Sequence, residues 1–281
     1  RLGTATGTLV GHTEPNVNVV VSDSAGKAAQ LGRSGVDGAY RLTLPAGTYQ
    51  AHAEHAARAT GASVAATVSA GQETTADLVA GPSGALQVTV VDGDGRPLPA
   101  RVLVDGPTSL VKYVGAEGSA AIGLPPGTYS LVISRGMEYD AYSEAAVVVG
   151  DNTVVPINVT LSRVVDTTGY ISLDCHLHSE MSTDSRIPLE DRLLAVAAEG
   201  IEVPIATDHD VITNYSQVVQ DLGLTDWVTP MTGEESSSIV FGHANGWPLE
   251  RDDDRAGGGA VSWYRHTPRE VWDGLRAGDP T

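Results

Sequence analysis

Cysteine is almost absent from this 281-residue chain, and Cys175 is the only one, so no internal disulfide can form. Aromatic residues make up only 5% of the chain, whereas Ala, Gly and Val are abundant. Any core must therefore be built from small aliphatic side chains. An apolar run of about 18 residues is also missing, and this excludes a membrane-spanning helix of ordinary length.

Positive charge is scarce as well. The chain has 17 Lys and Arg residues and 35 Asp and Glu residues, which gives a formal net charge of −18 at pH 7. Such a surface repels phosphate backbones and anionic lipid, so we expect no nucleic-acid partner and no membrane insertion. A small-molecule substrate, even an anionic one, is not excluded, because a bound metal ion can dominate the local field.

A repeat of two β-rich modules fills the first 165 residues. Short runs of Val, Thr and Ala alternate with Gly, Asp and Pro turns, which is typical of β-sandwiches. The segment Leu-Pro-x-Gly-Thr-Tyr at 44–49 returns at 124–129. Pro and Gly favour a tight turn, and we expect the hydroxyls of Tyr49 and Tyr129 to find backbone partners at the sandwich corner. The sequence thus predicts two antiparallel sandwiches of one topology, at 1–81 and 82–165.

With the strand Asp37-Gly38-Ala39-Tyr40 ahead of it, the Pro-x-Gly-Thr-Tyr unit resembles the carboxypeptidase-regulatory-like, transthyretin-like modules. These modules accompany many secreted enzymes and surface proteins. The resemblance covers both repeats and implies transthyretin- or Ig-like sandwiches in a secreted or periplasmic protein. The segment Asp92-Gly93-Asp94-Gly95 has two interpretations, a hairpin turn or a calcium loop. It lacks further oxygen ligands, which favours the turn.

The pattern changes after residue 166, which predicts a third domain over 166–281. Strands are favoured at 171–178, 201–207 and 227–235, with helices at 188–199 and 211–222 between them. Strands that alternate with helices indicate a parallel α/β arrangement. The segment Thr267-Pro268-Arg269-Glu270 is a capping box, and it predicts a last helix through Leu275.

Side chains that bind metals occur at the ends of these strands. His176 and His178 are two residues apart on one strand, so both rings project from one face. Cys175 faces the other way, and we expect it to be a buried structural thiol. A lone His or Glu at a strand end is commonly just a surface polar residue, but recurrence at successive strand ends favours a metal site. Imidazole mixed with carboxylate suits zinc, manganese or iron better than calcium. The candidate ligands are His176, His178, Asp184, His209, Glu235 and His243.

Four motifs in this order resemble the polymerase-and-histidinol-phosphatase (PHP) superfamily, and its carbaryl-hydrolase branch most of all. They are Asp174-x-His176-Leu177-His178-Ser179, Thr207-Asp208-His209, Gly233-x-Glu235 and Gly242-His243-x-Asn245. The resemblance covers residues 171–281 and implies a distorted (β/α)7 barrel that holds two or three divalent ions. It further implies that Glu235 bridges two ions and that Asp208 orients His209.

The same resemblance implies a hydrolase that attacks a small phosphoester, carbamate or ester with a metal-activated water. Asp208 and Glu235 would be its catalytic residues. The family's later His and its terminal Asp-x-His have no counterpart before Thr281, so we expect the third domain to be an incomplete barrel. A docked C-terminal remainder or another subunit would then cover the open edge.

One alternative comes from a different class of protein. The chain could be a structural, surface-assembly protein in which the sandwiches are the working part. The hydrolase remnant would then be a metal-stapled, non-catalytic scaffold. Turnover of a generic ester would favour the enzyme, whereas filaments or rings without turnover would favour the scaffold.

Overall fold

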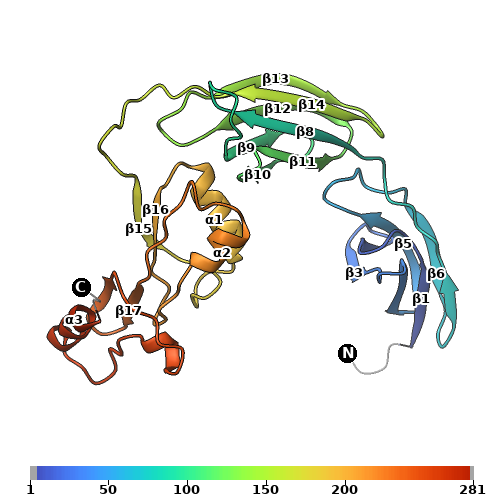
Figure 1. Cartoon of the computed structure of the whole chain (residues 1–281). Coiled ribbons are helices and arrows are strands. Elements are labelled where there is room, and N and C mark those ends of the chain that lie inside the picture. Colours follow the sequence, from blue (N-terminus) through green and yellow to red (C-terminus); the bar gives the residue numbers. More distant parts are fainter. Residues whose placement is uncertain (1–4, 279–281) are drawn as a thin grey trace.

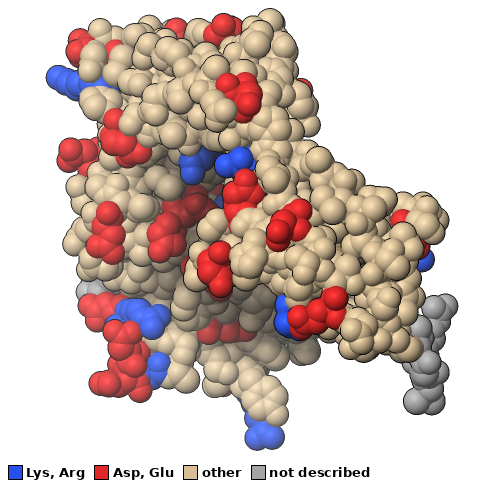
Figure 2. All heavy atoms as spheres, turned by 90° about the vertical axis from the view of Figure 1, so that its right-hand side faces the viewer, with Lys and Arg blue, Asp and Glu red and all other residues tan. Residues whose placement is uncertain are grey.

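The computed structural model describes residues 5–278, which form three units arranged as an arch (Figure 1). Two β-sandwiches follow each other along the chain, and a smaller mixed unit completes the arch. None of the helices among these residues is long and apolar enough to cross a membrane. Figure 2 shows acidic side chains spread over one face of the molecule, where they outnumber Lys and Arg.

The first sandwich consists of a three-stranded sheet in the order β4-β1-β7 and a four-stranded sheet in the order β3-β2-β5-β6. Side chains in β1, β4 and β5 alternate between buried and exposed, and the buried set forms a closed core of Val, Leu, Ala and Tyr residues. The strands are β1 (Thr6–His12), β2 (Asn18–Asp23), β3 (Ala28–Arg33), β4 (Ala39–Pro45), β5 (Gly47–Glu54), β6 (Val64–Val68) and β7 (Glu73–Thr75).

The second sandwich repeats this topology, with sheets in the orders β11-β8-β14 and β10-β9-β12-β13. In both sandwiches the last strand pairs in parallel with the first, β7 with β1 and β14 with β8. The expectation of purely antiparallel sheets is therefore wrong. The strands are β8 (Gly84–Val91), β9 (Ala100–Asp105), β10 (Leu110–Val114), β11 (Ser119–Leu124), β12 (Gly127–Ser134), β13 (Tyr142–Val149) and β14 (Val154–Thr160).

The repeated tyrosines lie at equivalent corners of the two sandwiches. Tyr49 donates its hydroxyl hydrogen to the carbonyl of Pro45 (2.8 Å), and Tyr129 donates to that of Pro125 (2.7 Å). The predicted backbone partners are confirmed. The segment that follows β8 closes a tight turn, in which a side-chain oxygen of Asp92 accepts hydrogen bonds from the Asp94 and Arg96 amides. The Asp92 carboxylate thus stabilises the turn, as the hairpin-turn interpretation of this segment requires.

Residues 166–278 form two separate two-stranded sheets and three α-helices. β15 and β16 are parallel, whereas β17 and β18 form an antiparallel hairpin. Isolated bridges, Ile205 with Met231 and His209 with Glu235, connect the two sheets. The elements are β15 (Leu173–Leu177), α1 (Leu189–Ala198), β16 (Val203–Ala206), α2 (Ser216–Asp221), β17 (Glu234–Ser238), β18 (Gly242–Gly246), the 3-10 helix η1 (Ala256–Gly259) and α3 (Pro268–Ala277).

The expected fold class, two sandwiches followed by an incomplete (β/α)7 barrel, is wrong in its last part. Within residues 5–278 there is no α/β barrel, and most of the regular structure is β-sandwich. The chain turns back after β17, where the Ser238 hydroxyl accepts hydrogen bonds from the Val240 and Phe241 amides. β17 therefore pairs with its own successor, and no helical crossover leads to a further parallel strand. Residues 279–281, where the barrel was expected to break off, lie outside the described part.

The last helix, α3, begins as its capping box predicts. The Thr267 side chain accepts from the Glu270 amide (3.4 Å), and the Glu270 carboxylate accepts from the Thr267 amide (2.7 Å). Both bonds satisfy donors that the first helical turn leaves without partners.

The second sandwich and the C-terminal unit pack directly against each other. Trp227 contacts the hydrophobic cores of both. Arg135, the residue after β12, donates one hydrogen bond to the carbonyl of Pro99 in its own sandwich (2.9 Å) and one to the carbonyl of Ala197 in α1 (2.6 Å). The two units are therefore joined by shared apolar and polar contacts.

Candidate metal centre

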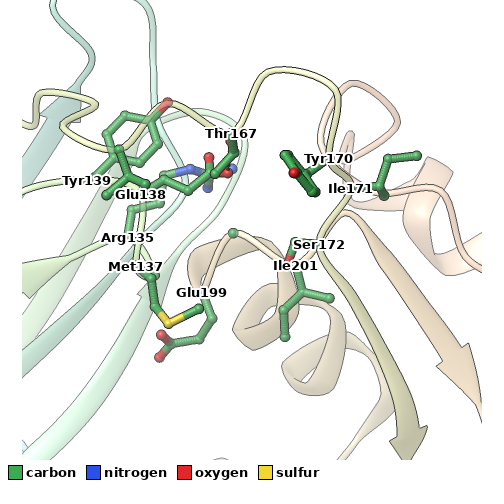
Figure 3. Close-up of a pocket in the computed structure, with 13 residues that line it drawn as sticks. Arg135, Met137, Glu138, Tyr139, Thr167, Tyr170, Ile171, Ser172, Glu199 and Ile201 are labelled. Atoms are coloured by element: carbon green, nitrogen blue, oxygen red, sulfur yellow. Dashed lines mark hydrogen bonds between the residues drawn. The ribbon is translucent and has the colours of Figure 1, made fainter.

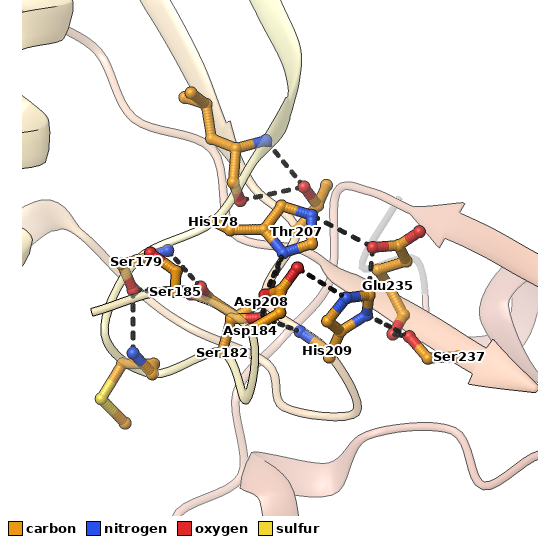
Figure 4. A network of polar contacts seen from close by, with 12 residues as sticks. His178, Ser179, Ser182, Asp184, Ser185, Thr207, Asp208, His209, Glu235 and Ser237 are labelled. Atoms are coloured by element: carbon orange, nitrogen blue, oxygen red, sulfur yellow. Dashed lines mark hydrogen bonds and ion pairs between the residues drawn. The ribbon is translucent and has the colours of Figure 1, made fainter. Parts of the chain in front are cut away.

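All six side chains that the sequence proposes as metal ligands converge in the C-terminal unit, and four of them, His178, Asp184, His209 and Glu235, are labelled in Figure 4. They come from β15 and the residue after it, the loop before α1, the segment that follows β16, β17 and β18. Their donor atoms form three overlapping groups, and within each group the atoms lie within 4.8 Å of one another. The groups are His176, His178 and Glu235; His178, Asp184 and His209; and His209, Glu235 and His243.

The position of the first two histidines follows from how β15 is anchored. Leu177 is buried, its amide donates to the Thr207 hydroxyl (2.8 Å), and that hydroxyl donates to the Leu177 carbonyl (3.0 Å). His176 and His178 flank Leu177, and their ring nitrogens lie close to Glu235. Cys175, in contrast to the expectation, is exposed. Because β15 pairs irregularly with β16 between Asp174 and Leu177, strict alternation does not predict which side chains are buried there.

Glu235 lies at the middle of the cluster and is only 3% exposed. Its Oε2 atom lies 3.1 Å from His178 Nε2 and 3.1 Å from His209 Nδ1. The same oxygen is 3.4 Å from His176 Nε2, and Oε1 is 2.9 Å from His243 Nδ1. One buried carboxylate therefore faces four imidazole rings, which is the placement that a bridging ligand needs.

Asp184 closes the other side of the cluster from an exposed loop. Its Oδ1 atom lies 3.1 Å from His178 Nδ1, and its Oδ2 atom lies 3.3 Å from His209 Nε2. A hydrogen bond from the Ser182 hydroxyl, helped by His178 and His209, lowers the pKa of Asp184 to about 2. The carboxylate is thus ionised at neutral pH and able to bind a cation.

The contacts of His178 and His209 show why this cluster fits cations. Each ring has a carboxylate oxygen near both of its nitrogens, from Glu235 on one side and Asp184 on the other. A neutral imidazole has one donor and one acceptor nitrogen, and an ionised carboxylate only accepts. In each neutral ring, the nitrogen that carries no hydrogen would therefore lie against a carboxylate oxygen, and the lone pairs of these two atoms repel each other. A divalent cation between such a nitrogen and oxygen would be bound by both.

Asp208 acts differently from the role that the family resemblance implied. It is fully buried, and its carboxylate accepts from the amide (2.6 Å) and hydroxyl (3.0 Å) of Ser179 and from the Tyr215 hydroxyl (3.3 Å). The His209 ring that it was expected to orient contacts the Ser237 hydroxyl instead. Burial, with the nearby Asp208 charge, raises the pKa of Tyr215, so this phenol stays protonated as a donor.

Two serines of the cluster were missed by the sequence analysis. Ser182 donates to Asp184 (2.7 Å), accepts from the His209 amide (3.2 Å) and lies 3.0 Å from His178 Nδ1. Ser237 contacts the His209 ring and donates to the Glu235 carbonyl (2.7 Å). Serine is common in loops, so residue type alone gave no signal. The short spacing between Ser182 and Asp184 was the only available hint.

No family model and no curated protein match this chain. Among solved structures, it is similar to the minor pilin GBS52 of Streptococcus agalactiae, with 15% identity, a TM-score of 0.33 and coverage of 57% of this chain and 97% of the pilin. It is similar to the shaft pilin SpaA of Lactobacillus rhamnosus GG, with 10% identity, a TM-score of 0.35 and coverage of 57% and 99%.

The Bacillus anthracis TIE protein is a further match, with 18% identity, a TM-score of 0.28 and 57% of this chain covered. This chain spans about a third of that protein, 35% of its length. At such low identities and TM-scores, the three matches assign no function to the chain.

The expected membership of the PHP superfamily is wrong. No family model supports it, and residues 5–278 lack the α/β barrel of that family. The prediction of a PHP-type hydrolase, with Asp208 and Glu235 as its catalytic residues, rested on that membership and is withdrawn with it. What remains is a cluster of imidazoles and carboxylates in a protein dominated by β-sandwiches.

Proposed function

We propose that this chain is a structural, surface-assembly protein of the secreted or cell-surface class, whose C-terminal unit is stapled by two or three divalent ions (zinc, manganese or iron). The observation that carries the proposal is that His178 and His209 each face carboxylates at both ring nitrogens. A cation bound between the rings and the carboxylates removes the repulsion between nitrogen and oxygen lone pairs, whereas two neutral rings without a cation keep it.

The shortness of its elements supports a stapling role in the C-terminal unit. Its sheets have two strands each, and a two-stranded sheet is marginal on its own in water. The six ligands come from segments between residues 176 and 243, so bound ions would crosslink β15, the loop before α1, the segment after β16, β17 and β18. Because ligands are not held together in an unfolded chain, the free energy of ion binding becomes free energy of folding.

The exposure of the ligands favours a scaffold over a catalyst. The side chains of His176, Asp184 and His243 are 57%, 56% and 48% exposed. Catalytic sites gain much of their electrostatic effect by excluding water, and this cluster lies open along one side. The two sandwiches have a common strand order and large cores of their own, as modules used for spacing do.

Metal analysis and unfolding test this proposal directly. We expect the purified chain to bind two or three zinc or manganese ions after metal removal and reloading, with a higher Tm when loaded. Glu235→Gln should lose at least one ion and most of the Tm increase, because Glu235 is shared by two of the three groups. His55→Ala, which removes an exposed His of the first sandwich, is the matched control and should behave as the parent chain.

Two results would overturn the proposal. If the chain bound none of the three metals, the proposal that ions stabilise the C-terminal unit would be wrong. Rapid hydrolysis of an activated phosphodiester or an aryl ester by the metal-loaded chain would remove the structural, non-catalytic role.

A further inference from the structure

A cavity with a volume of about 440 Å³ lies at the junction between the second sandwich and the C-terminal unit (Figure 3). Its walls are the β12–β13 loop (135–139), the connecting segment (165–172) and the loop after α1 (199–201). The volume lies in the range of pockets that hold small organic molecules, and such pockets commonly occur between domains. None of the six candidate metal ligands lines it.

The mouth of this junction cavity carries an unusual number of exposed apolar side chains. Met137 is 92% exposed on the sandwich side, and Tyr170 and Ile171 are 81% and 68% exposed on the opposite side. In Figure 3, Met137 and Tyr139 lie across the cavity from Tyr170 and Ile201. Single exposed apolar residues are ordinary, but several around one concave site are typical of binding sites.

Arg135 supplies the cavity with a buried cation. Its side chain lies over the Trp227 ring (4.5 Å to the centroid) and near that of Tyr139 (5.7 Å), and the residue is 6% exposed. Among the described residues, its Nε atom has no hydrogen-bond partner and its guanidinium has no carboxylate within 4.0 Å. Burial lowers the pKa of Arg135, and Tyr139 and the more distant charges of Glu138 and Glu202 only partly oppose this shift. Such a group is costly unless an anion accompanies it.

The two carboxylates that line the cavity, and that of Glu202 nearby in sequence, already have partners. Glu138 pairs with Arg163 at 2.7 Å, and Glu199 pairs with Arg101 at 3.6 Å. The Glu202 carboxylate accepts a hydrogen bond from the Ser172 amide at 2.8 Å. Within residues 5–278, Arg135 is thus the charged group of this cavity that forms no ion pair within 4.0 Å.

We infer that the junction cavity binds a small carboxylate with an apolar body, such as an aryl or branched aliphatic acid. The carboxylate would accept from the Arg135 guanidinium, and the body would lie between Met137 on the sandwich side and Tyr170 and Ile201 on the other. Because the walls belong to both units, the bound molecule holds the second sandwich against the C-terminal unit.

Calorimetric titration of the full, metal-loaded chain with 3-phenylpropionate tests the inference, with 3-phenylpropan-1-ol as the neutral probe of matched size. We expect the acid to bind one per chain and the alcohol to bind roughly 10- to 100-fold more weakly, as loss of a charge-assisted hydrogen bond implies. Equal affinity for acid and alcohol, or no binding of the acid, would overturn the inference.

Variants place the binding in this cavity. Tyr170→Ala removes an exposed wall residue and should weaken binding of the acid several-fold without loss of folding. Arg135→Lys keeps the charge but loses the planar fork, and should weaken it further. Tyr264→Ala, at a residue that is 62% exposed and lies outside the cavity, is the control and should bind the acid as the parent does. Unchanged affinity in Tyr170→Ala and Arg135→Lys together would show that the acid binds elsewhere.

Discussion

Tyr40 is a buried phenol in the core of the first sandwich, where its hydroxyl donates to the carbonyl of Ala76. Burial, and to a lesser extent the charge of Asp77, raises the pKa of Tyr40 to about 12. The ordinary pKa of a tyrosine is about 10. An unfolded chain therefore releases this proton at a lower pH than the folded chain does.

This difference predicts an alkaline loss of stability. Below pH 10 the tyrosine is protonated in both states, and its contribution is fully present. Between about pH 10 and 12 the unfolded state loses the proton first, so the free energy of unfolding falls, by roughly 2 kcal/mol in all. We expect Tyr40→Phe to flatten this part of the curve while it costs about 1 kcal/mol at pH 7, where the hydrogen bond is lost. Urea unfolding at a series of pH values measures both effects, and parallel curves for the two chains would contradict the assignment.

Asp208 provides a second test at the scale of single residues. Asp208→Asn cannot keep every hydrogen bond from Ser179 and Tyr215, so the segment that carries His178 and Asp184 should loosen. Loss of a group that positions a ligand typically costs 10- to 100-fold in metal affinity, and we expect a loss in this range. Tyr215→Phe leaves the Ser179 bonds in place and should lose less. Competition with a chromophoric chelator compares the chains, and equal affinities would show that Asp208 positions nothing.

For single residues, the sequence predicted which candidate ligands lie close together but not which hydrogen bonds hold them in place. The spacing of His176 and His178 on β15, and the position of His209 after β16, follow the expectation, whereas Glu235 lies near the start of β17 and not at the end of the strand expected at 227–235. The bonds of Asp208 to Ser179 could not be foreseen, because they join residues 29 positions apart through a loop conformation. The buried position expected for Cys175 was wrong for a related reason, since alternation fails where strand pairing is irregular.

The contact between the second sandwich and α1 depends on a glycine at the start of a loop. Gly136 has a φ of +53°, and a Cβ atom there would lie 2.1 Å from the carbonyl oxygen of Glu199. Gly95 also has a positive φ, +81°, but nothing lies within 4 Å of its Cβ position. The two glycines share the backbone requirement and differ only in the neighbouring element.

A pair of alanine substitutions separates these two effects. We expect Gly95→Ala to lower the free energy of unfolding by about 1 kcal/mol, through backbone strain alone. Gly136→Ala should cost more and should also move the C-terminal unit away from the sandwich. Hydrogen exchange of the amides in α1 measures this movement. Equal exchange rates in Gly95→Ala and Gly136→Ala would mean that the contact between Gly136 and Glu199 does not hold the two units together.

Among the elements, local signals were the most reliable. The capping box at Thr267 correctly predicted the start of α3, and Pro188 and Gly200 bracket α1 as helix signals should. The pairing of strands was less predictable, because a run of β-favouring residues indicates an extended segment but does not determine which other strand it pairs with. The antiparallel hairpin of β17 and β18 depends on the turn at 239–241, which the sequence did not predict.

For the whole molecule, metal ions are expected to stabilise one part of the chain and not the rest. The sandwich cores contain none of the candidate ligands, which all lie in the C-terminal unit. Differential scanning calorimetry with and without a chelator should show one transition that shifts by several degrees and another that stays in place. A uniform shift of every transition would indicate that the three units unfold as one.

Short motifs were also a poor guide to architecture. Four motifs in order suggested the first part of a family barrel, yet each depends on only a few side chains, and a cluster of ligands can form without any barrel. The repeat in the sandwiches was a stronger basis for prediction, because it recurs over whole modules with their buried side chains.

The parallel pairing of first and last strands determines how each sandwich would respond to tension. Because β1 and β7 run the same way, as do β8 and β14, opposite pulls on the two ends of a module slide these strands past each other. The hydrogen bonds between them are then loaded together in shear instead of breaking one by one. Three residue pairs share this load in the first sandwich and seven in the second. Under a steadily rising force the first sandwich should therefore yield before the second, so that the chain lengthens in two separate steps.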